Sequence, residues 1–337
     1  MKVNFSQDSN KTNLVLLDGI SGSGKTLLSK VLDTYKSNSL PKFAYNIEQL
    51  CIASHLNWLD FDKAKELLNL QINQIWYDQS IGREVNFRNG DLSSALSSTK
   101  RVDYLLQTFA LREMRRPPEN SVLVVHQLLN TADILKSLFQ RQMTHVVCYR
   151  HPFYLFNHWL TSVNIYQKTH NNFTLMIPKP NNSTQPWFMN NYAGKDYDSA
   201  TSDYDLAAIY LSHLTIEGLN LLAKQEQDNP KFIAIDFEGF VLNPNTYMRK
   251  LDRIFNESPV KMKTTLRNEK VPRGHINDGR KRKIYTRYLS GKLTTELSQA
   301  KHYHFLREEI MNLVTPKVFA ELEDSANQYE QVFGVWF

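Results

Sequence analysis

A glycine-rich motif near the amino end places the tightest constraint on what this chain can fold into. Residues 19–26 read Gly-Ile-Ser-Gly-Ser-Gly-Lys-Thr, which fits the pattern G-x-x-x-x-G-K-[ST]. The apolar run Asn13–Asp18 precedes the motif, and Lys25–Tyr35 follows it with leucine and valine at helical spacing. The motif therefore stands between a predicted buried strand and a predicted helix, which is the context of a phosphate-binding P-loop.

The residue types of this loop suit an anionic ligand. Glycines let successive main-chain N–H groups turn toward phosphate oxygens, and the start of a helix adds partial positive charge. Lys25 is expected to reach across the phosphates, and Thr26 to bond a phosphate oxygen or hold Mg²⁺. The alternative is a glycine turn without a ligand. The candidate nucleotide-binding residues of the loop are Gly19, Ser21, Gly22, Ser23, Gly24, Lys25 and Thr26.

Further apolar runs predict a parallel sheet. Ser121–Val125, His145–Tyr149 and Lys231–Asp236 are apolar enough to be buried on both faces, and a helical segment at about 131–141 separates the first two. A long helix is predicted at Asp203–Gln227. The predicted fold class is α/β: a P-loop three-layer sandwich with a central, mainly parallel sheet and helices on both faces.

The 337 residues are predicted to form a single nucleotide-binding transferase domain with a mostly helical insertion at about 40–116. Asp62–Asp78 is the clearest helix of that insertion. Asn171–Asp198 is polar and carries three prolines, so it is expected to be a long loop. Pro244–Phe255 is expected to be a helix with Asn243 as its N-cap.

Composition limits which cellular compartment and which binding partners are expected for the chain. Two cysteines cannot form a disulfide framework, no Cys/His spacing predicts a metal site, and the first residues carry no secretory pattern. The apolar runs are too short for a membrane span. Because the cysteines form no disulfide framework, a reduced compartment, most simply the cytoplasm, is expected. The net charge is +6, with basic residues concentrated between Lys261 and Arg287. This basic segment suits a polyanionic small molecule or a solvated loop, and nucleic acid is not the expected partner.

The residues that follow the predicted strands bear on the chemistry. An ATP-using P-loop protein normally has a strand that ends in a magnesium-binding aspartate. Here Ser121–Val125 is followed by His126 and His145–Tyr149 by Arg150. An imidazole at the carboxyl edge of a sheet lies where ligands of such folds bind, and it can take a proton from an acceptor hydroxyl. The alternative for a single histidine is a buried or capping role.

Taken in order, these segments resemble the sulfotransferases that use the donor 3′-phosphoadenosine 5′-phosphosulfate. In that family, a loop at the 5′-phosphosulfate is similar to Gly19–Thr26, and a strand ending in a catalytic histidine is similar to Val122–His126. A strand followed by Arg-x-Pro, which binds the 3′-phosphate, is similar to Tyr149–Pro152. The segment Phe237–Pro244 is similar to one that precedes a helix in those enzymes, and the likeness covers about half of the chain.

The chain departs from the family pattern at three places. The lysine of the loop stands at the kinase-like position, so Gly22 occupies the family's usual catalytic Lys/Arg position. The serine that normally follows Arg-x-Pro is missing, and Asn157 or His158 stands near its place. The family's carboxyl-terminal Arg-Lys-Gly motif has only a loose counterpart in Arg273-Gly274.

The resemblance implies a role for each matching residue. Lys25 and the main-chain amides of residues 22–26 are expected to hold the 5′-phosphosulfate. Arg150 is expected to bind the 3′-phosphate, with Asn157 and Arg273 as further candidates. His126, together with Lys25, is the expected catalytic residue and deprotonates a hydroxyl or amine acceptor. No metal is expected in this mechanism.

Two rival functions remain open at this stage. An ATP-dependent kinase would keep Lys25 and Thr26, add Mg²⁺, and place Asp236 or Asp18 near the metal. A non-catalytic nucleotide-binding protein would show no turnover. Trp159, Trp187 and Phe188 are candidates for an acceptor pocket, although ordinary packing is the commoner role of such residues.

Overall fold

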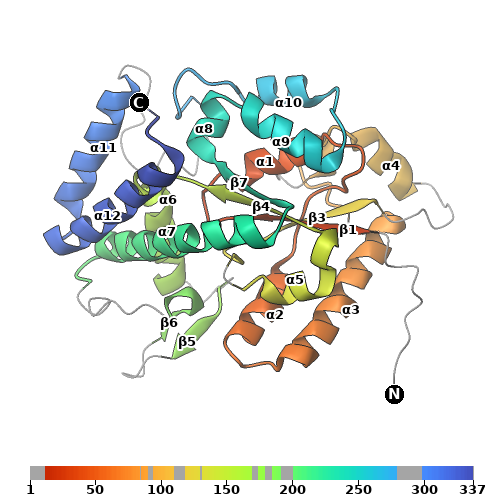
Figure 1. The fold of residues 1–337 in the computed structure, drawn as a ribbon, viewed down its shortest axis with the longest axis horizontal. Helices are drawn as coiled ribbons and strands as arrows, with labels where there is room; N and C mark the ends of the chain where they lie inside the picture. Colours follow the sequence, from red (N-terminus) through yellow and green to blue (C-terminus); the bar gives the residue numbers. More distant parts are fainter. Residues whose placement is uncertain are drawn as a thin grey trace.

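A five-stranded parallel sheet forms the centre of the molecule (Figure 1). The computed structural model describes residues 12–83, 85–89, 94–109, 118–129, 131–168, 174–178, 184–190, 200–278 and 298–336. The strands lie in the order β2 (Lys42–Phe43), β3 (Asn120–Val124), β1 (Asn13–Asp18), β4 (Met143–Tyr149) and β7 (Phe232–Asp236).

The strands are buried on both faces, as their apolar sequences predict. Every residue of β3 and β4 is buried, and alternate side chains enter separate hydrophobic clusters. Val15 and Leu17 of β1 face one cluster, whereas Leu14 and Leu16 face the other. This two-sided burial is typical of parallel sheets covered by helices.

Helices cover both faces of the sheet, so the molecule has three layers (Figure 1). The predicted fold class, α/β with a central parallel sheet between two helical layers, is confirmed. On one face lie α1 (Lys25–Leu32), α8 (Phe237–Leu242), α9 (Asn245–Phe255) and α10 (Met262–Asn268). On the other lie α2 (Tyr45–His55), α3 (Phe61–Ser80), α5 (Asp133–Phe139), α6 (Pro152–Lys168), α7 (Asp203–Asp228), α11 (Gln299–Leu313) and α12 (Pro316–Phe333).

Side-chain caps fix where several helices begin. Asp60 accepts a hydrogen bond from the Lys63 amide at the start of α3, and Ser202 accepts one from Asp205 at the start of α7. Such caps satisfy amides that have no partner within the helix. Three further short elements are η2 (Ala95–Ser97), α4 (Arg101–Phe109) and η3 (Gln140–Gln142).

Helix α7 is the longest helix described. Its stretch Asp203–Gln225 is long and apolar enough to cross a membrane by length and composition, which the sequence analysis did not predict. However, 67% of its most apolar window is buried inside the protein, where it packs against α6 and α12. A buried core helix passes the same test, so this stretch is weak evidence for a membrane span. The cytoplasmic location stays a prediction.

The strand order creates a crevice at the carboxyl edge of the sheet. Strand β1 lies between β3 and β4, so the chain crosses over β1 on its way from one side of the sheet to the other. Ligands of open α/β sheets bind where the strand order reverses in this way. The loop after β1, the residues after β3 and Arg150 after β4 all belong to this edge.

Two local predictions were wrong. Within Asn171–Asp198, β5 (Met176–Pro178) and β6 (Thr184–Pro186) form an antiparallel pair, followed by η4 (Trp187–Met189), so the described part of this segment is not an irregular loop. Asn243 ends α8 instead of capping α9, because Asp236 already starts a helix at Phe237 by accepting a hydrogen bond from the Gly239 amide. The single-domain prediction with a helical insertion at 40–116 stays a prediction.

Candidate functional site

The carbonyl groups of the glycine-rich loop are held by side chains from the surrounding helices and strands. The Lys25 ammonium turns back and donates to the carbonyls of Gly19 and Ile20. The next three carbonyls accept from Trp159, Arg150 and Cys148, at donor–acceptor distances of 3.1, 3.0 and 3.0 Å. The five consecutive carbonyls of residues 19–23 are therefore all bonded to side chains.

Although the carbonyls of the loop are bonded, several of its main-chain amides are left without an acceptor. Within the described part of the chain, the amides of Gly22, Gly24 and Thr26 have no hydrogen-bond acceptor. Gly24 and Thr26 lie at the start of α1, whose partial positive charge favours an anion there. This loop therefore has the donors that a phosphate or phosphosulfate group requires.

Two glycines of the loop are required by close contacts. Gly24 has a φ of 116°, and a Cβ atom there would lie 2.2 Å from the Phe237 ring. Gly19 has a φ of 133°, and a Cβ atom there would lie 2.3 Å from the Cys148 carbonyl oxygen. No L side chain fits these contacts without a shift of the main chain, so the motif's glycines set the approach of the loop to β4 and α8.

Arg150 and Arg273 come together on one aromatic ring beside the loop. The guanidinium carbon of Arg150 lies 4.6 Å from the centroid of the Phe237 ring, and that of Arg273 lies 5.4 Å from it. Burial, and next the charge of Arg150, lowers the pKa of Arg273 to about 10. Arg150 Nε also lies 3.8 Å from a Glu238 carboxylate oxygen. Guanidinium groups are the side chains best suited to bind phosphate.

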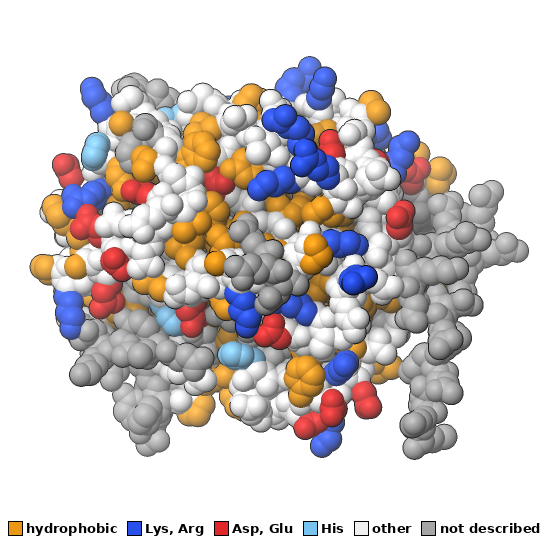
Figure 2. Space-filling model, viewed as in Figure 1, with side chains coloured by type: hydrophobic (Ala, Val, Ile, Leu, Met, Phe, Trp, Pro, Cys, Tyr) orange, Lys and Arg blue, Asp and Glu red, His pale blue; other side chains and the backbone are white. Residues whose placement is uncertain are grey.

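The basic side chains between Lys261 and Arg273 differ in whether they point toward solvent or toward the glycine-rich loop. The described Lys261, Lys263, Arg267 and Lys270 are exposed on or near α10, and Figure 2 shows Lys and Arg side chains gathered over the part of the molecule that holds α9 and α10. Arg273 instead turns inward, and its NH1 donates to the Ile276 carbonyl at 2.8 Å. Of the described basic residues in this segment, Arg273 is the one that lies on the Phe237 ring beside the glycine-rich loop, while residues 279–287 lie outside the described structure.

His126 follows β3 at the same edge and is held by Glu48 of α2. One Glu48 carboxylate oxygen accepts from the His126 main-chain amide at 2.9 Å and lies 3.3 Å from the ring Nδ1. Because a carboxylate only accepts, this contact places the ring proton on Nδ1 and leaves the Nε2 lone pair available. The ring also stacks on Phe43 and Tyr45, with centroids 5.9 and 5.7 Å away.

The charges around His126 keep it in its neutral form. Burial lowers the pKa of His126, the Lys25 ammonium lowers it further, and Glu48 opposes both effects. Burial lowers the pKa of Lys25 to about 8, while Asp18, Cys148 and Glu48 raise it. A neutral imidazole beside a buried ammonium can act as a general base at neutral pH.

His158 is a further site residue. Its Nε2 lies 2.9 Å from the Ser21 hydroxyl, and a Cβ atom at Gly22 would lie 2.5 Å from its ring. Burial and the charges of Arg150 and Lys25 lower the pKa of His158 to about 4, so the ring is neutral at pH 7. Asn157, the preceding residue, has a buried Oδ1 atom without a hydrogen-bond partner in the described structure.

Both carboxylates considered for a kinase-type metal site are used by the protein itself. Asp18 accepts from the amides of Gly19 and Leu128 at 2.6 and 3.1 Å, and its other oxygen lies 3.2 Å from His145 Nε2. Asp236 accepts from the Gly239 amide at 2.9 Å and from the Tyr247 hydroxyl. Among the described residues, no group of three or more His, Cys, Asp or Glu could hold a metal ion.

Comparison with known proteins gives a weak likeness to one class of enzyme. No protein-family model matches this chain, and no curated protein matches it in sequence. Solved structures with a similar fold include the sulfotransferase domain of the Synechococcus PCC 7002 olefin synthase, at 11% identity over 95% of each chain with a TM-score of 0.38. The sulfotransferase domain from the curacin biosynthetic pathway is 14% identical over 74% of this chain and 76% of that one, with a TM-score of 0.35.

A third similar structure is the sulfotransferase STF9 from Mycobacterium avium, which is 12% identical over 77% of this chain and 67% of that chain, with a TM-score of 0.35. Because these TM-scores lie below 0.5, the similarities carry no argument about the activity of this chain. Its function is inferred from its own residues.

The structure brings together most of the residues selected from the sequence. Lys25, Arg150 and Arg273 lie around residues 22–24, and His126 is close enough to Lys25 to respond to its charge. Glu48, Phe237 and Cys148 are site residues that could not be predicted from the sequence. Each of them lies far along the chain from its partner, and no motif announces the contact. Trp159 is fully buried, and its indole N–H holds the loop, so it does not line an acceptor pocket.

Proposed function

We propose that this chain is a sulfotransferase-like enzyme that moves a sulfuryl group from 3′-phosphoadenosine 5′-phosphosulfate to a hydroxyl or amine acceptor. One observation carries the proposal: Arg150 and Arg273 lie on the same Phe237 ring, beside a loop with unpaired amides. A donor with two separate anionic groups would use both features, whereas a nucleoside triphosphate carries all of its phosphates on the 5′ oxygen and has no 3′-phosphate for the two arginines.

Unsatisfied polar atoms support the fit of such a donor. Among buried atoms without a partner in the described structure are Ser23 Oγ, Asn157 Oδ1 and Arg273 Nε. Buried polar groups are normally bonded, so their grouping around one loop favours a ligand that supplies the missing partners. We infer that the unpaired amides of Gly22, Gly24 and Thr26, together with Lys25, hold the 5′-phosphosulfate and that Arg150 and Arg273 hold the 3′-phosphate.

His126 is the proposed general base. Its Nε2 takes the proton of the acceptor as the acceptor oxygen or nitrogen forms a bond to sulfur. The bond between sulfur and the 5′-phosphate oxygen breaks, and its electron pair leaves with adenosine 3′,5′-bisphosphate. Glu48 stabilises the resulting imidazolium through its contact with Nδ1. Lys25 would neutralise charge that develops on the leaving oxygen, which is the main task in a transfer of this kind.

A kinase remains the second candidate because Lys25 stands at the kinase-like position of the loop. The engagement of Asp18 and Asp236 in protein hydrogen bonds disfavours it. Donor binding separates the two: a sulfotransferase-like site prefers adenosine 3′,5′-bisphosphate without metal, and a kinase prefers ADP with Mg²⁺. A non-catalytic nucleotide-binding protein would bind either ligand but show no transfer and no dependence on His126.

A further inference from the structure

The outer face of α9 and α10 carries a concentration of basic side chains. Both helices bury apolar side chains, among them Met248, Leu251 and Met262, in the hydrophobic cluster that they share with α1 and the sheet. The opposite sides of the two helices face solvent, and Figure 2 shows Lys and Arg side chains gathered there. We call this the α9–α10 surface, and its exposed basic residues are Arg249, Lys250, Arg253, Lys261, Lys263 and Arg267.

The acidic side chains of the same segment are bonded to the body of the protein. Three carboxylates lie between residues 245 and 270, and each binds α1 or the residues that follow it. The partners are the Tyr35 hydroxyl for Asp252 at 2.7 Å, the Lys36 amide for Glu257 at 2.8 Å, and the Lys30 ammonium for Glu269. Within the described part of the chain, none of the six basic side chains forms an ion pair, so positive charge dominates the surface.

An apolar side chain protrudes from the turn that joins the two helices. Val260 is 92% exposed, the highest value among the large hydrophobic residues of the described chain. A single exposed valine is common on protein surfaces and needs no partner. This one stands between the basic residues of α9 and those of α10, however, and a bilayer is a partner with both an anionic layer and an apolar layer beneath it.

A nucleic acid would also attract basic side chains, but the α9–α10 surface lacks a second feature of such sites. Proteins that bind single strands without sequence preference present aromatic rings on which bases stack. The aromatic residues between 245 and 270 are Tyr247 and Phe255, and both pack against the hydrophobic cluster instead of facing outward. Lipid headgroups require no stacking ring, so the observations favour a membrane surface.

We propose that the α9–α10 surface binds the anionic phospholipid headgroups of a membrane, with Val260 entering the boundary between headgroups and acyl chains. The apolar side of α9 is buried in the protein, so this helix lies against the membrane and does not insert into it. Each Lys or Arg near an anionic bilayer strengthens binding by about fivefold, and salt weakens the attraction. The inference goes beyond the proposed transfer reaction and does not depend on it.

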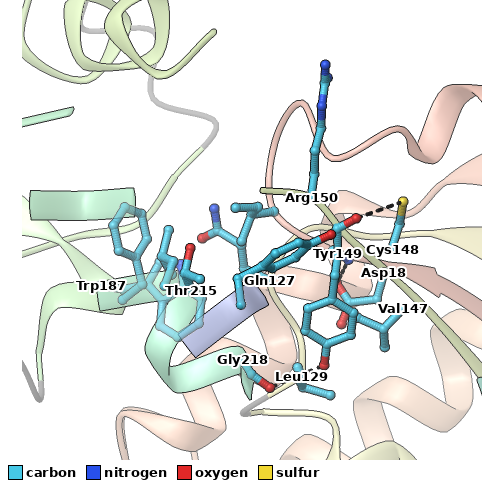
Figure 3. Close-up of a pocket in the computed structure, with 15 residues that line it drawn as sticks. Asp18, Gln127, Leu129, Val147, Cys148, Tyr149, Arg150, Trp187, Thr215 and Gly218 are labelled. Carbon is cyan, nitrogen blue, oxygen red and sulfur yellow. Dashed lines mark hydrogen bonds between the residues drawn. The ribbon is translucent and has the colours of Figure 1, made fainter. Parts of the chain in front are cut away.

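The anion-binding residues of the candidate donor site lie in the same helical layer as this surface. Figure 3 shows the Arg150 side chain extending away from Trp187 and Thr215, which lie on the α7 side of the sheet. Arg150 contacts Phe237 of α8, which belongs to the hydrophobic cluster that α9 and α10 share. A headgroup phosphate carries the same charge as a nucleotide phosphate, so the experiment has to separate the two sites.

The test is co-sedimentation of the full chain with phosphatidylcholine vesicles that contain about 30% phosphatidylserine, and with vesicles of phosphatidylcholine alone. We expect binding to the anionic vesicles at about 0.1 M salt, loss of this binding at about 0.5 M salt, and no binding to the neutral vesicles. Adenosine 3′,5′-bisphosphate should leave vesicle binding unchanged. Displacement from the vesicles by the bisphosphate would place the headgroups in the donor site and overturn the inference.

Substitutions locate the contact. Lys263→Glu with Arg267→Glu reverses two charges on α10 and should weaken vesicle binding by at least about 25-fold. Val260→Ser removes the apolar side chain without a change of charge and should weaken binding by about threefold. Lys63→Glu with Lys224→Glu is the matched control, because it changes the net charge equally at exposed lysines of α3 and α7. It should weaken vesicle binding by less than about threefold.

Three further results would overturn the inference. The first is equal binding to vesicles with and without phosphatidylserine, and the second is an equal loss of binding in the two double variants. The third is tighter binding to a DNA duplex of about 20 base pairs than to the anionic vesicles at the same salt, which would make nucleic acid the partner. Unchanged vesicle binding of Val260→Ser would overturn the role assigned to Val260.

Discussion

Glu48 holds His126 at two points, accepting from its main-chain amide at 2.9 Å and lying 3.3 Å from its Nδ1. The first contact fixes where the residue stands, and the second fixes the tautomer and the orientation of the ring. Glu48 is thus a positioning residue for the proposed base. It comes from α2, 78 positions earlier in the chain.

Replacing Glu48 by Gln should lower the transfer rate by roughly tenfold, a part of the 10²–10⁴-fold that a general base contributes. Because Glu48 raises the pKa of His126, its removal should also move the acid limb of the pH–rate profile to lower pH. Asp133→Asn, at an exposed carboxylate that pairs with Lys136, is the control. An unchanged acid limb in Glu48→Gln would count against the positioning role.

His126→Asn and His126→Gln should lower the transfer rate by about 10²–10⁴-fold and remove the acid limb of its pH profile. Nucleotide affinity and melting temperature should change little, because the ring is partly exposed and no other described residue bonds to its Nε2. The measurements are initial rates across pH and thermal melts. A loss of stability with an unchanged rate per folded molecule would assign His126 a structural role only.

Lys25 should make nucleotide binding depend on pH. Burial lowers its pKa to about 8, so the ammonium is charged below this pH and increasingly neutral above it. A bound anion favours the charged form. Affinity for adenosine 3′,5′-bisphosphate should therefore be constant below about pH 8 and fall by up to about tenfold per pH unit above it. Calorimetry at several pH values measures this dependence.

Lys25→Arg keeps its charge across this pH range and should flatten the decline, and Lys25→Ala should weaken binding at every pH without unfolding the protein. A wild-type affinity that is independent of pH between 7 and 9.5 would contradict the account of Lys25.

Gly24→Ala tests the packing of the loop against α8. The new Cβ atom would overlap the Phe237 ring and stand at a φ of 116°, so we expect a loss of roughly 2–4 kcal/mol in the free energy of unfolding, with impaired nucleotide binding. At Gly274, the nearest atom to a new Cβ is Asp278 Oδ2 at 3.5 Å, so Gly274→Ala is the matched control. Denaturant unfolding of both variants measures the two free energies of unfolding. If Gly24→Ala were as stable as Gly274→Ala, the close contact between Gly24 and Phe237 would be refuted.

The elements that the sequence predicted best are those with strong periodic or apolar patterns. β1 occupies the predicted residues Asn13–Asp18, and α3 and α7 differ from their predictions by two residues or fewer at each end. Helix α8 was missed because it has six residues, contains a glycine, and is buried on nearly all sides, so it has no polar face to reveal a period.

The site was predictable only where a motif marks it. The loop and Arg150 could be selected because each stands directly after an apolar strand. The side chains that support the loop could not be selected from the sequence. The Cys148 thiol and the Trp159 indole bond to loop carbonyls because the fold brings them there, and their apolar neighbours in the sequence would be the same without these bonds. Arg273 was selected from the sequence only through its loose likeness to the family's Arg-Lys-Gly motif, and its contact with Phe237 is visible only in the fold.

Substitution of the arginine pair should remove the preference for a 3′-phosphate. Adenosine 3′,5′-bisphosphate should bind more tightly than 5′-AMP, and Arg150→Ala should lose about 1.5–3 kcal/mol of that preference, which is about 10- to 150-fold in affinity. Arg273→Ala should lose part of the same preference, and the double variant should lose less than the sum, because both side chains would hold one group. Lys263→Ala, at an exposed basic residue of α10, is the control.

Calorimetry of the wild-type chain with adenosine 3′,5′-bisphosphate, and separately with ADP and Mg²⁺, tests the central claim most directly. The arrangement of Arg150 and Arg273 beside the loop predicts tight binding of the bisphosphate without metal and at least tenfold weaker binding of ADP with Mg²⁺, about 1.4 kcal/mol. Tighter binding of ADP that depends on Mg²⁺ would contradict the sulfotransferase-like proposal and support the kinase.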